Sequence, residues 1–112
     1  MDDAMSETRL AAVRLKIDRV DRQLVRLLAV RKTLVETAAR IKRYPRYVVD
    51  ADRNEVVLDN VRRWAHEFGL SIAIAERIWR YQTELWTRHQ LDLMIHESGE
   101  HPYEGHISET QD

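Results

Sequence analysis

Two cations lie in line with the apolar positions of residues 24–43, which read LVRLLAVRKTLVETAARIKR. Apolar residues recur there every three or four positions, the spacing of a buried helix face, yet Arg31 takes one of those positions and Lys42 lies near the end. Burying an unpaired cation costs several kcal/mol, so Arg31 needs an anion beside it. A carboxylate of the same protein or a bound anionic ligand would serve. The internal candidates are Asp18, Asp21 and Glu36.

The spacing of the cations limits what they could bind together. Arg31 and Lys42 are eleven residues apart, which on a helix is almost three whole turns, or about 16 Å along one face. A small molecule between them could contact both side chains, although Lys42 alone also suits a solvated charge near a helix C-terminus. Arg14 lies 17 residues before Arg31, about 25 Å away and about a quarter turn round. It could reach the same kind of pocket in the partner chain of an antiparallel dimer.

The element that carries these cations is expected to be one long helix from about Ser6 to Arg43, with Ser6 as its N-cap. Such a helix is about 55 Å long. Two shorter helices of the same chain cannot cover an apolar seam of that length, so the sequence predicts an oligomer, most simply a dimer. The seam has heptad spacing and consists of Val13, Ile17, Val20, Leu24, Leu27, Leu34, Ala38 and Ile41.

A loop and a second helix are expected next. Pro45 disfavours a helical conformation of the residue before it, which predicts a loop over residues 44–49. The second helix is expected from about Ala51 to Phe68. Its expected capping residues are Asp50 or Asp52 at the start and Gly69 at the end.

The third helix is expected from about Ile72 to Glu97, with Ser71 as its cap. Gln90 lies on its apolar stripe, and a buried amide needs a hydrogen-bonding partner, either on another helix or on a ligand. Two indoles on the stripe, Trp79 and Trp86, are expected to be core residues. We therefore predict an all-α protein with a single helical domain over residues 1–97 and a disordered tail over residues 98–112.

Composition restricts the class of protein. The chain has 112 residues, of which 44% are hydrophobic and 33% charged, as is typical of a soluble, helix-rich domain. It has no cysteine, which excludes disulfides, a thiol nucleophile and thiolate metal sites, and which suits the reducing cytoplasm. No signal peptide or membrane span is predicted. A net charge of −1 argues against nucleic acid as a partner.

Three segments together resemble a known family. They read VRLKIDRVDRQLVRLLAVRKTLVETAARIK, DADRNEVV and IWRYQTELWTRHQ, and they resemble the all-helical chorismate mutases of the AroQ class over roughly residues 10–95. The resemblance depends on the spacing of several polar residues, which are Arg14, Arg31, Lys42, Arg53 and Gln90. It implies an intertwined homodimer of three-helix chains with two shared active sites.

The resemblance also implies a role for each residue. Arg14 of the partner chain and Arg31 would hold the two carboxylates of chorismate, and Lys42 and Gln90 would bind its ether oxygen. Asp50 and Arg53 would shape the ring end of the pocket. The implied reaction, a unimolecular [3,3] rearrangement to prephenate, needs no nucleophile, metal or cofactor. It needs a compact substrate conformer and positive charge at the breaking C–O bond, which makes Lys42, Gln90 and Arg31 the implied catalytic residues.

Two positions depart from the family pattern and leave the substrate open. Asn54 stands where many members have a glutamate, and Trp86 stands where a small hydroxyl residue is common. Both are expected to contact the substrate. The loop before Arg53 resembles in length that of isochorismate pyruvate-lyases, which also lack the glutamate, as do some mutases acting on 4-amino-4-deoxychorismate. These two activities are the alternatives on the same scaffold.

Three alternatives belong to other classes. One alternative is a helical dimer without activity, which would have the same fold and bind no dicarboxylate ligand. A nucleic-acid binder would use a basic patch formed by Arg40, Lys42, Arg43, Arg46, Arg62 and Arg63. A metal site would use His89, His96, His101 and His106, but the first two are about two helical turns apart, too far for one ion.

Overall fold

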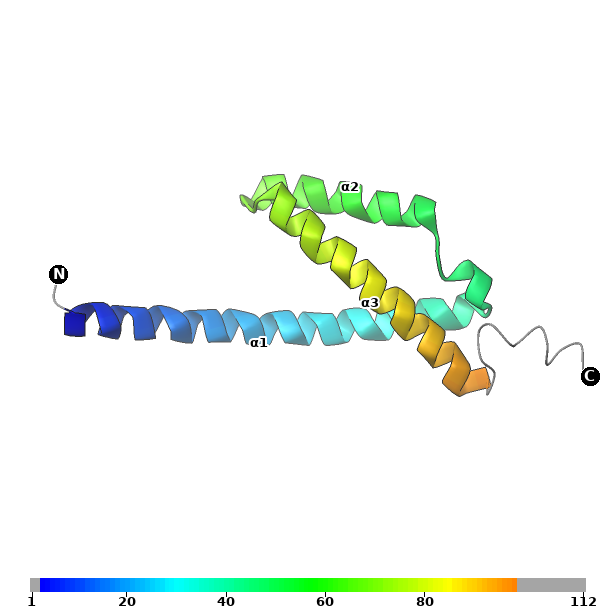
Figure 1. The fold of residues 1–112 in the computed structure, drawn as a ribbon, viewed down its shortest axis with the longest axis horizontal. Helices are drawn as coiled ribbons and strands as arrows, with labels where there is room; N and C mark the ends of the chain where they lie inside the picture. Colours follow the sequence, from blue (N-terminus) through cyan, green and yellow to red (C-terminus); the bar gives the residue numbers. More distant parts are fainter. Residues whose placement is uncertain (1–2, 99–112) are drawn as a thin grey trace, which may run out of the picture. The chain divides into compact units, whose positions relative to one another are not determined.

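The computed structural model describes residues 3–98, and all regular secondary structure within them is helical. The long helix α1 spans Asp3–Lys42, α2 spans Ala51–Phe68 and α3 spans Ile72–Ser98 (Figure 1). A short 3-10 helix, η1, spans Pro45–Tyr47 between α1 and α2. The prediction of an all-α fold with one long and two shorter helices is confirmed. The disordered tail was predicted from residue 98, but Ser98 is the last residue of α3, and residues 99–112 lie outside the described part of the chain.

The two ends of α1 differ from the prediction by a few residues. Ser6 is not the N-cap, because the helix already begins at Asp3, whose carboxylate in the first turn suits the positive end of the helix dipole. At the other end, Arg43 leaves the helix with a left-handed φ of 69°. Its N–H donates to the carbonyl of Ala39 at 3.0 Å, which closes the last turn. Tyr44 before the proline is extended, with φ −117° and ψ 140°, as predicted.

The caps of α2 and α3 agree with the sequence. Asp50, rather than Asp52, is the N-cap of α2, since its Oδ1 accepts a hydrogen bond from the N–H of Arg53 at 3.0 Å. Gly69 ends α2 in the left-handed conformation, with φ 72°, where a side chain would be strained. The Oγ of Ser71 accepts from the N–H of Ile74 at 3.3 Å and caps α3.

The cap at Asp50 gives a stability prediction. Asp50→Ala should lower the free energy of unfolding by about 1 kcal/mol, because the first turn of α2 loses an acceptor. Asp50→Asn keeps an acceptor of the same length and should stay within about 0.5 kcal/mol of the wild type. Urea denaturation at one fixed protein concentration measures both. Equal losses in the two variants would mean that the cap is not what Asp50 contributes.

The chain divides into two compact units, Met1–Leu34 and Val35–Asp112, called here the N-terminal and C-terminal units. In the N-terminal unit the predicted seam of α1 is exposed in the single chain. The exposed fractions run from 50% to 64% at Val13, Ile17, Val20, Leu24, Leu27 and Leu34. A row of large apolar side chains exposed at heptad spacing is typical of a helix that packs against another chain.

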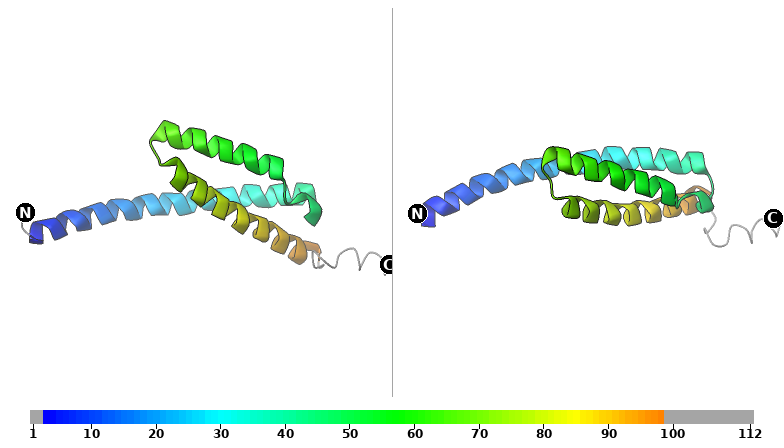
Figure 2. Two further views of the ribbon diagram at one scale, coloured as in Figure 1. Left: turned by 45° about the horizontal axis from the view of Figure 1, so that its top comes forward. Right: turned by 90° about the horizontal axis from the view of Figure 1, so that it is seen from above.

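The C-terminal unit contains two small cores. One joins the end of α1, the following loop and α3, through Ala39, Val48 and Met94, with Leu91 and Leu93 packed against them. The other lies between α2 and α3, which run in opposite directions from the turn at Gly69 (Figure 2). It consists of Val61, Ala65 and Ala75, with Val57 and Trp79 packed against them. Trp79 is therefore a core residue, as predicted.

A polar cluster also joins α2 to α3. The Nε of Arg62 on α2 donates to Oε1 of Glu76 on α3 at 2.6 Å, and its Nη1 donates to Oδ1 of Asp59 at 2.8 Å. The hydrogen bond from Arg62 lowers the pKa of the Glu76 carboxyl, and the same bond raises the pKa of Arg62. The cluster favours the charged form of Glu76 in the folded chain.

This cluster predicts a pH-dependent stability. A carboxyl whose pKa is lower in the folded state stabilises the protein above its unfolded pKa, and this contribution is lost as the pH falls through the folded value. Glu76→Gln should therefore lower the melting temperature at pH 7, and the difference from the wild type should shrink below about pH 4. Glu84→Gln, which changes an exposed carboxylate of α3, is the control. A Glu76→Gln difference that is independent of pH would contradict the prediction.

Candidate active site

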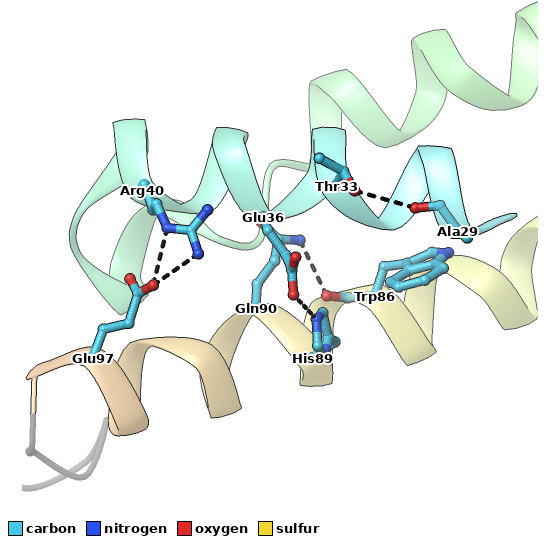
Figure 3. Close-up of polar contacts among 8 residues, drawn as sticks. All are labelled: Ala29, Thr33, Glu36, Arg40, Trp86, His89, Gln90 and Glu97. Carbon is cyan, nitrogen blue, oxygen red and sulfur yellow. Dashed lines mark hydrogen bonds and ion pairs between the residues drawn. The ribbon is translucent and has the colours of Figure 1, made fainter. Parts of the chain in front are cut away.

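The structure brings Lys42 and Gln90 into direct contact. Lys42 is the last residue of α1 and is half-buried, and Gln90 is buried on α3 with 8% exposure. The Nζ of Lys42 donates to Oε1 of Gln90 at 3.1 Å. Gln90 is held on its other side as well, because its Nε2 donates to the backbone carbonyl of Trp86 at 3.2 Å (Figure 3). The amide therefore presents its oxygen to the ammonium group.

Packing sets the approach of these two side chains. Ala39, almost one turn before Lys42, is the buried residue of α1 with an exposed fraction of 1%, and Met94, about one turn after Gln90, packs against it. Alanine is small enough for the two helix backbones to approach closely. Val48 from the loop after α1 closes the same core. The sequence thus places a small residue where α1 must approach α3 for Lys42 to reach Gln90.

A second polar contact lies beside the first. The Nε2 of His89 on α3 and Oε2 of Glu36 on α1 are 2.8 Å apart (Figure 3). The His89 ring also meets the Trp86 ring edge to face, with centroids 5.7 Å apart. Nearer the end of α3, the Nε of Arg40 donates to Oε1 of Glu97 at 2.9 Å.

The contact between Glu36 and His89 was not predicted from the sequence. The sequence suggested Glu36 as a partner for Arg31, and it suggested His89 as a ligand in the alternative metal site. A detectable sign was present, since an acid lies one turn from the buried Ala39 and a histidine lies next to Gln90, both near the predicted helix contact. In the described part of the chain, no group of three or more acidic or histidine side chains could hold a metal ion.

The side chain of Trp86 is half-buried, and its Nε1 donates to Oε1 of Gln82 one turn earlier, at 3.2 Å. This bond satisfies the indole N–H within α3. Trp86 thus contributes its backbone carbonyl to Gln90 and its ring to His89. Its expected contact with substrate stays a prediction.

The other site residues of the C-terminal unit lie at the start of α2. The carboxylate of Asp50 caps the helix, so it has a structural role whatever it does for a ligand. The backbone carbonyl of Asp50 accepts from the N–H of Asn54 at 2.9 Å. Asn54 is half-buried and the side chain of Arg53 is exposed. Their roles in shaping the ring end of the pocket stay predictions.

Arg14 and Arg31 lie on the N-terminal unit. Arg14 is exposed on α1, as are its neighbours, and Arg31 is half-buried. Their binding of the two substrate carboxylates stays a prediction.

The predicted basic patch is reduced by internal contacts. Arg40 and Arg62 form ion pairs with Glu97 and Glu76, and the guanidinium of Arg46 lies over the Tyr44 and Tyr47 rings at 4.9 and 5.0 Å. The carboxylates beside Arg40 and Arg62 lower the positive potential of this surface, whereas the tyrosine rings leave the charge of Arg46 in place.

No α-helix within residues 3–98 combines the length and the hydropathy that crossing a membrane requires.

The arrangement defines a class of protein. It is an all-helical chain in which a lysine and a buried amide meet where the first and third helices pack. Residues 13–91 match the family model of chorismate mutase type II, and this span contains every predicted site residue, from Arg14 to Gln90. The chain belongs to the chorismate mutase type II family. No curated protein and no solved structure matches the chain significantly.

Proposed function

We propose that this protein is a chorismate mutase, which converts chorismate to prephenate in two active sites shared between the chains of a homodimer. The observation that supports it most directly is the contact between Lys42 and Gln90, within a span that belongs to the chorismate mutase type II family. A small dicarboxylate is the substrate class that two arginines and a lysine on one helix would recognise.

The proposed mechanism is electrostatic. Lys42 has three N–H donors and gives one to Gln90, so about two can turn toward the substrate. As the ether C–O bond breaks, its oxygen gains negative charge, and the ammonium group stabilises that charge more strongly in a partly buried site than in water. Arg31 and the partner's Arg14 would grip the two carboxylates and hold the substrate in its compact conformer. The reaction needs no cofactor and no metal.

The proposed dimer accounts for the exposed seam of α1. Large apolar side chains at heptad spacing are only half-covered in the single chain, and a second copy of α1 would bury them. In such a dimer the N-terminal and C-terminal units would form one helical domain over residues 1–97, completed by the partner. A dimer would also bring Arg14 to the other chain's site.

The test is product analysis with three substrates in parallel. The purified protein is incubated with chorismate, isochorismate and 4-amino-4-deoxychorismate, and the products are separated by chromatography. Prephenate from chorismate supports the proposal and makes Asn54 a tolerated variation. Salicylate and pyruvate from isochorismate, with little prephenate, would overturn it in favour of the lyase.

Selective turnover of the amino analogue would likewise replace the assignment. Turnover of none of the three, by a folded dimer, would favour a helical dimer without activity. Asn54, where many relatives have a carboxylate, is the reason that all three substrates belong in the experiment.

A further inference from the structure

We propose that Glu36 and His89 form a positioning pair, which fixes the approach of α3 to the end of α1 and so keeps Gln90 aligned with Lys42. The inference rests on the proposed function only in its kinetic consequence, because the alignment itself can be measured without substrate. Neither Glu36 nor His89 is among the residues for which the family resemblance implies a role.

The contacts between α1 and α3 differ in how far they are exposed to water. Within residues 3–98, the side-chain hydrogen bonds between the end of α1 and α3 include Glu36 with His89, Lys42 with Gln90, and Arg40 with Glu97. The Arg40–Glu97 pair is open to water, with side chains 53% and 45% exposed, and such pairs contribute little. The side chains of Glu36 and His89 are 19% and 32% exposed, so their contact is less screened by solvent.

A continuous series of contacts runs from His89 to Gln90. His89 directly precedes Gln90, and its ring is fixed on two sides, by the Glu36 carboxylate and by the edge of the Trp86 ring. Trp86 in turn accepts the Nε2 hydrogen bond of Gln90 through its carbonyl. One turn of α3, residues 86–90, thus carries both His89 of the positioning pair and Gln90, whose amide the pair aligns (Figure 3).

The side-chain amide of Gln90 must keep one orientation to accept a hydrogen bond from Lys42. An amide turned by half a rotation would present its NH₂ group to the Lys42 ammonium, and two donors would then oppose each other. The observed orientation places the oxygen toward Lys42 and requires the Trp86 carbonyl on the far side. If α3 shifts relative to α1 by even about 1 Å, alignment in a site of this kind can fail with a large loss of rate. The Glu36–His89 contact opposes that shift.

The kinetic test compares two replacements of His89. His89→Phe keeps a ring against Trp86 and removes the ring nitrogen Nε2 that meets Glu36, whereas His89→Gln keeps an amide nitrogen near the position of Nε2. We expect His89→Phe to lower kcat for chorismate by about 10- to 100-fold with KM changed less than about threefold. His89→Gln should restore kcat to within a few-fold of the wild type. Arg40→Met breaks the neighbouring exposed pair and is the matched control, expected to change kcat less than about twofold.

The spectroscopic test needs no turnover. The side-chain amide resonances of Gln90 in the ligand-free protein are assigned by their loss in Gln90→Leu and compared among variants. In His89→Phe they should move toward their positions in Lys42→Met, and in His89→Gln they should stay near the wild type. A chain that turns over no chorismate but shows these shifts would contradict the proposed function and keep the positioning pair.

Two results would overturn the positioning pair. One is a folded His89→Phe protein with unmoved Gln90 resonances and an unchanged kcat, which would make the contact merely structural. The other comes from Glu36→Gln, which keeps the shape of the side chain and weakens its contact with His89. This variant replaces His89→Phe in the experiment if His89→Phe does not fold. In Glu36→Gln the Gln90 resonances should move in the direction seen for Lys42→Met. Resonances that stay at their wild-type positions would reject the proposal.

Discussion

Replacing Lys42 by methionine is expected to lower kcat for chorismate by about 10²- to 10³-fold, the effect of removing one preorganised donor from a developing oxyanion. Methionine keeps an unbranched side chain of similar length and removes only the charge and the donors. Because the ether oxygen gains its negative charge in the transition state, the loss should fall mainly on kcat, with a smaller change in KM. Steady-state kinetics measured by the disappearance of chorismate give both constants.

The control for Lys42 is another lysine of the same helix, in the N-terminal unit. Lys32 is exposed on α1, and Lys32→Met should leave kcat within about twofold of the wild type. Circular dichroism verifies that both variants stay helical. Retained turnover in a folded Lys42→Met protein would remove Lys42 from the chemistry, and its contact with Gln90 would then be an ordinary interhelical hydrogen bond.

Local sequence features predicted most of the helix ends, because each depends on a few neighbouring residues. Pro45 kept Tyr44 extended just after the end of α1 at Lys42, Asp50 capped α2, and Gly69 took the left-handed conformation that stops α2. The prediction at Ser6 was wrong for the same local reason. Nothing at Asp3 or the two residues after it breaks a helix, and Ser6 lacks the acid three residues later that would strengthen a cap there.

The contacts of the candidate site were less predictable from the sequence than the helix ends. Helical periodicity placed Arg31 and Lys42 on one face of a single helix, but it could not say which residue of α3 Lys42 meets, 48 positions further along the chain. The family resemblance implied that Lys42 and Gln90 share one substrate atom, the ether oxygen, but it did not predict their direct contact. The contact of Glu36 with His89 followed from neither, since it depends on how closely α1 and α3 approach at Ala39. Periodicity describes one helix at a time and carries no information on that approach.

The proposed sharing of sites between chains predicts a recovery of activity by mixing. Arg14→Ala and Arg31→Ala should each abolish turnover as homodimers, because each site then lacks one carboxylate partner, while the dimers survive. After the two variants are mixed and their chains exchange at random, about half of the dimers are heterodimers. Each heterodimer contains one site with both arginines intact and one site with neither. Activity should therefore return to about a quarter of the wild-type value.

The alternative gives a different number, which makes the experiment decisive. If both arginines of a site came from the same chain, every site in the mixture would lack one of them, and no activity would return. Mass spectrometry of the intact dimers shows whether exchange has occurred, so that an absent recovery cannot be blamed on slow mixing. Recovery near a quarter would assign Arg14 to the partner's site, the role that its offset from Arg31 along the helix led us to predict.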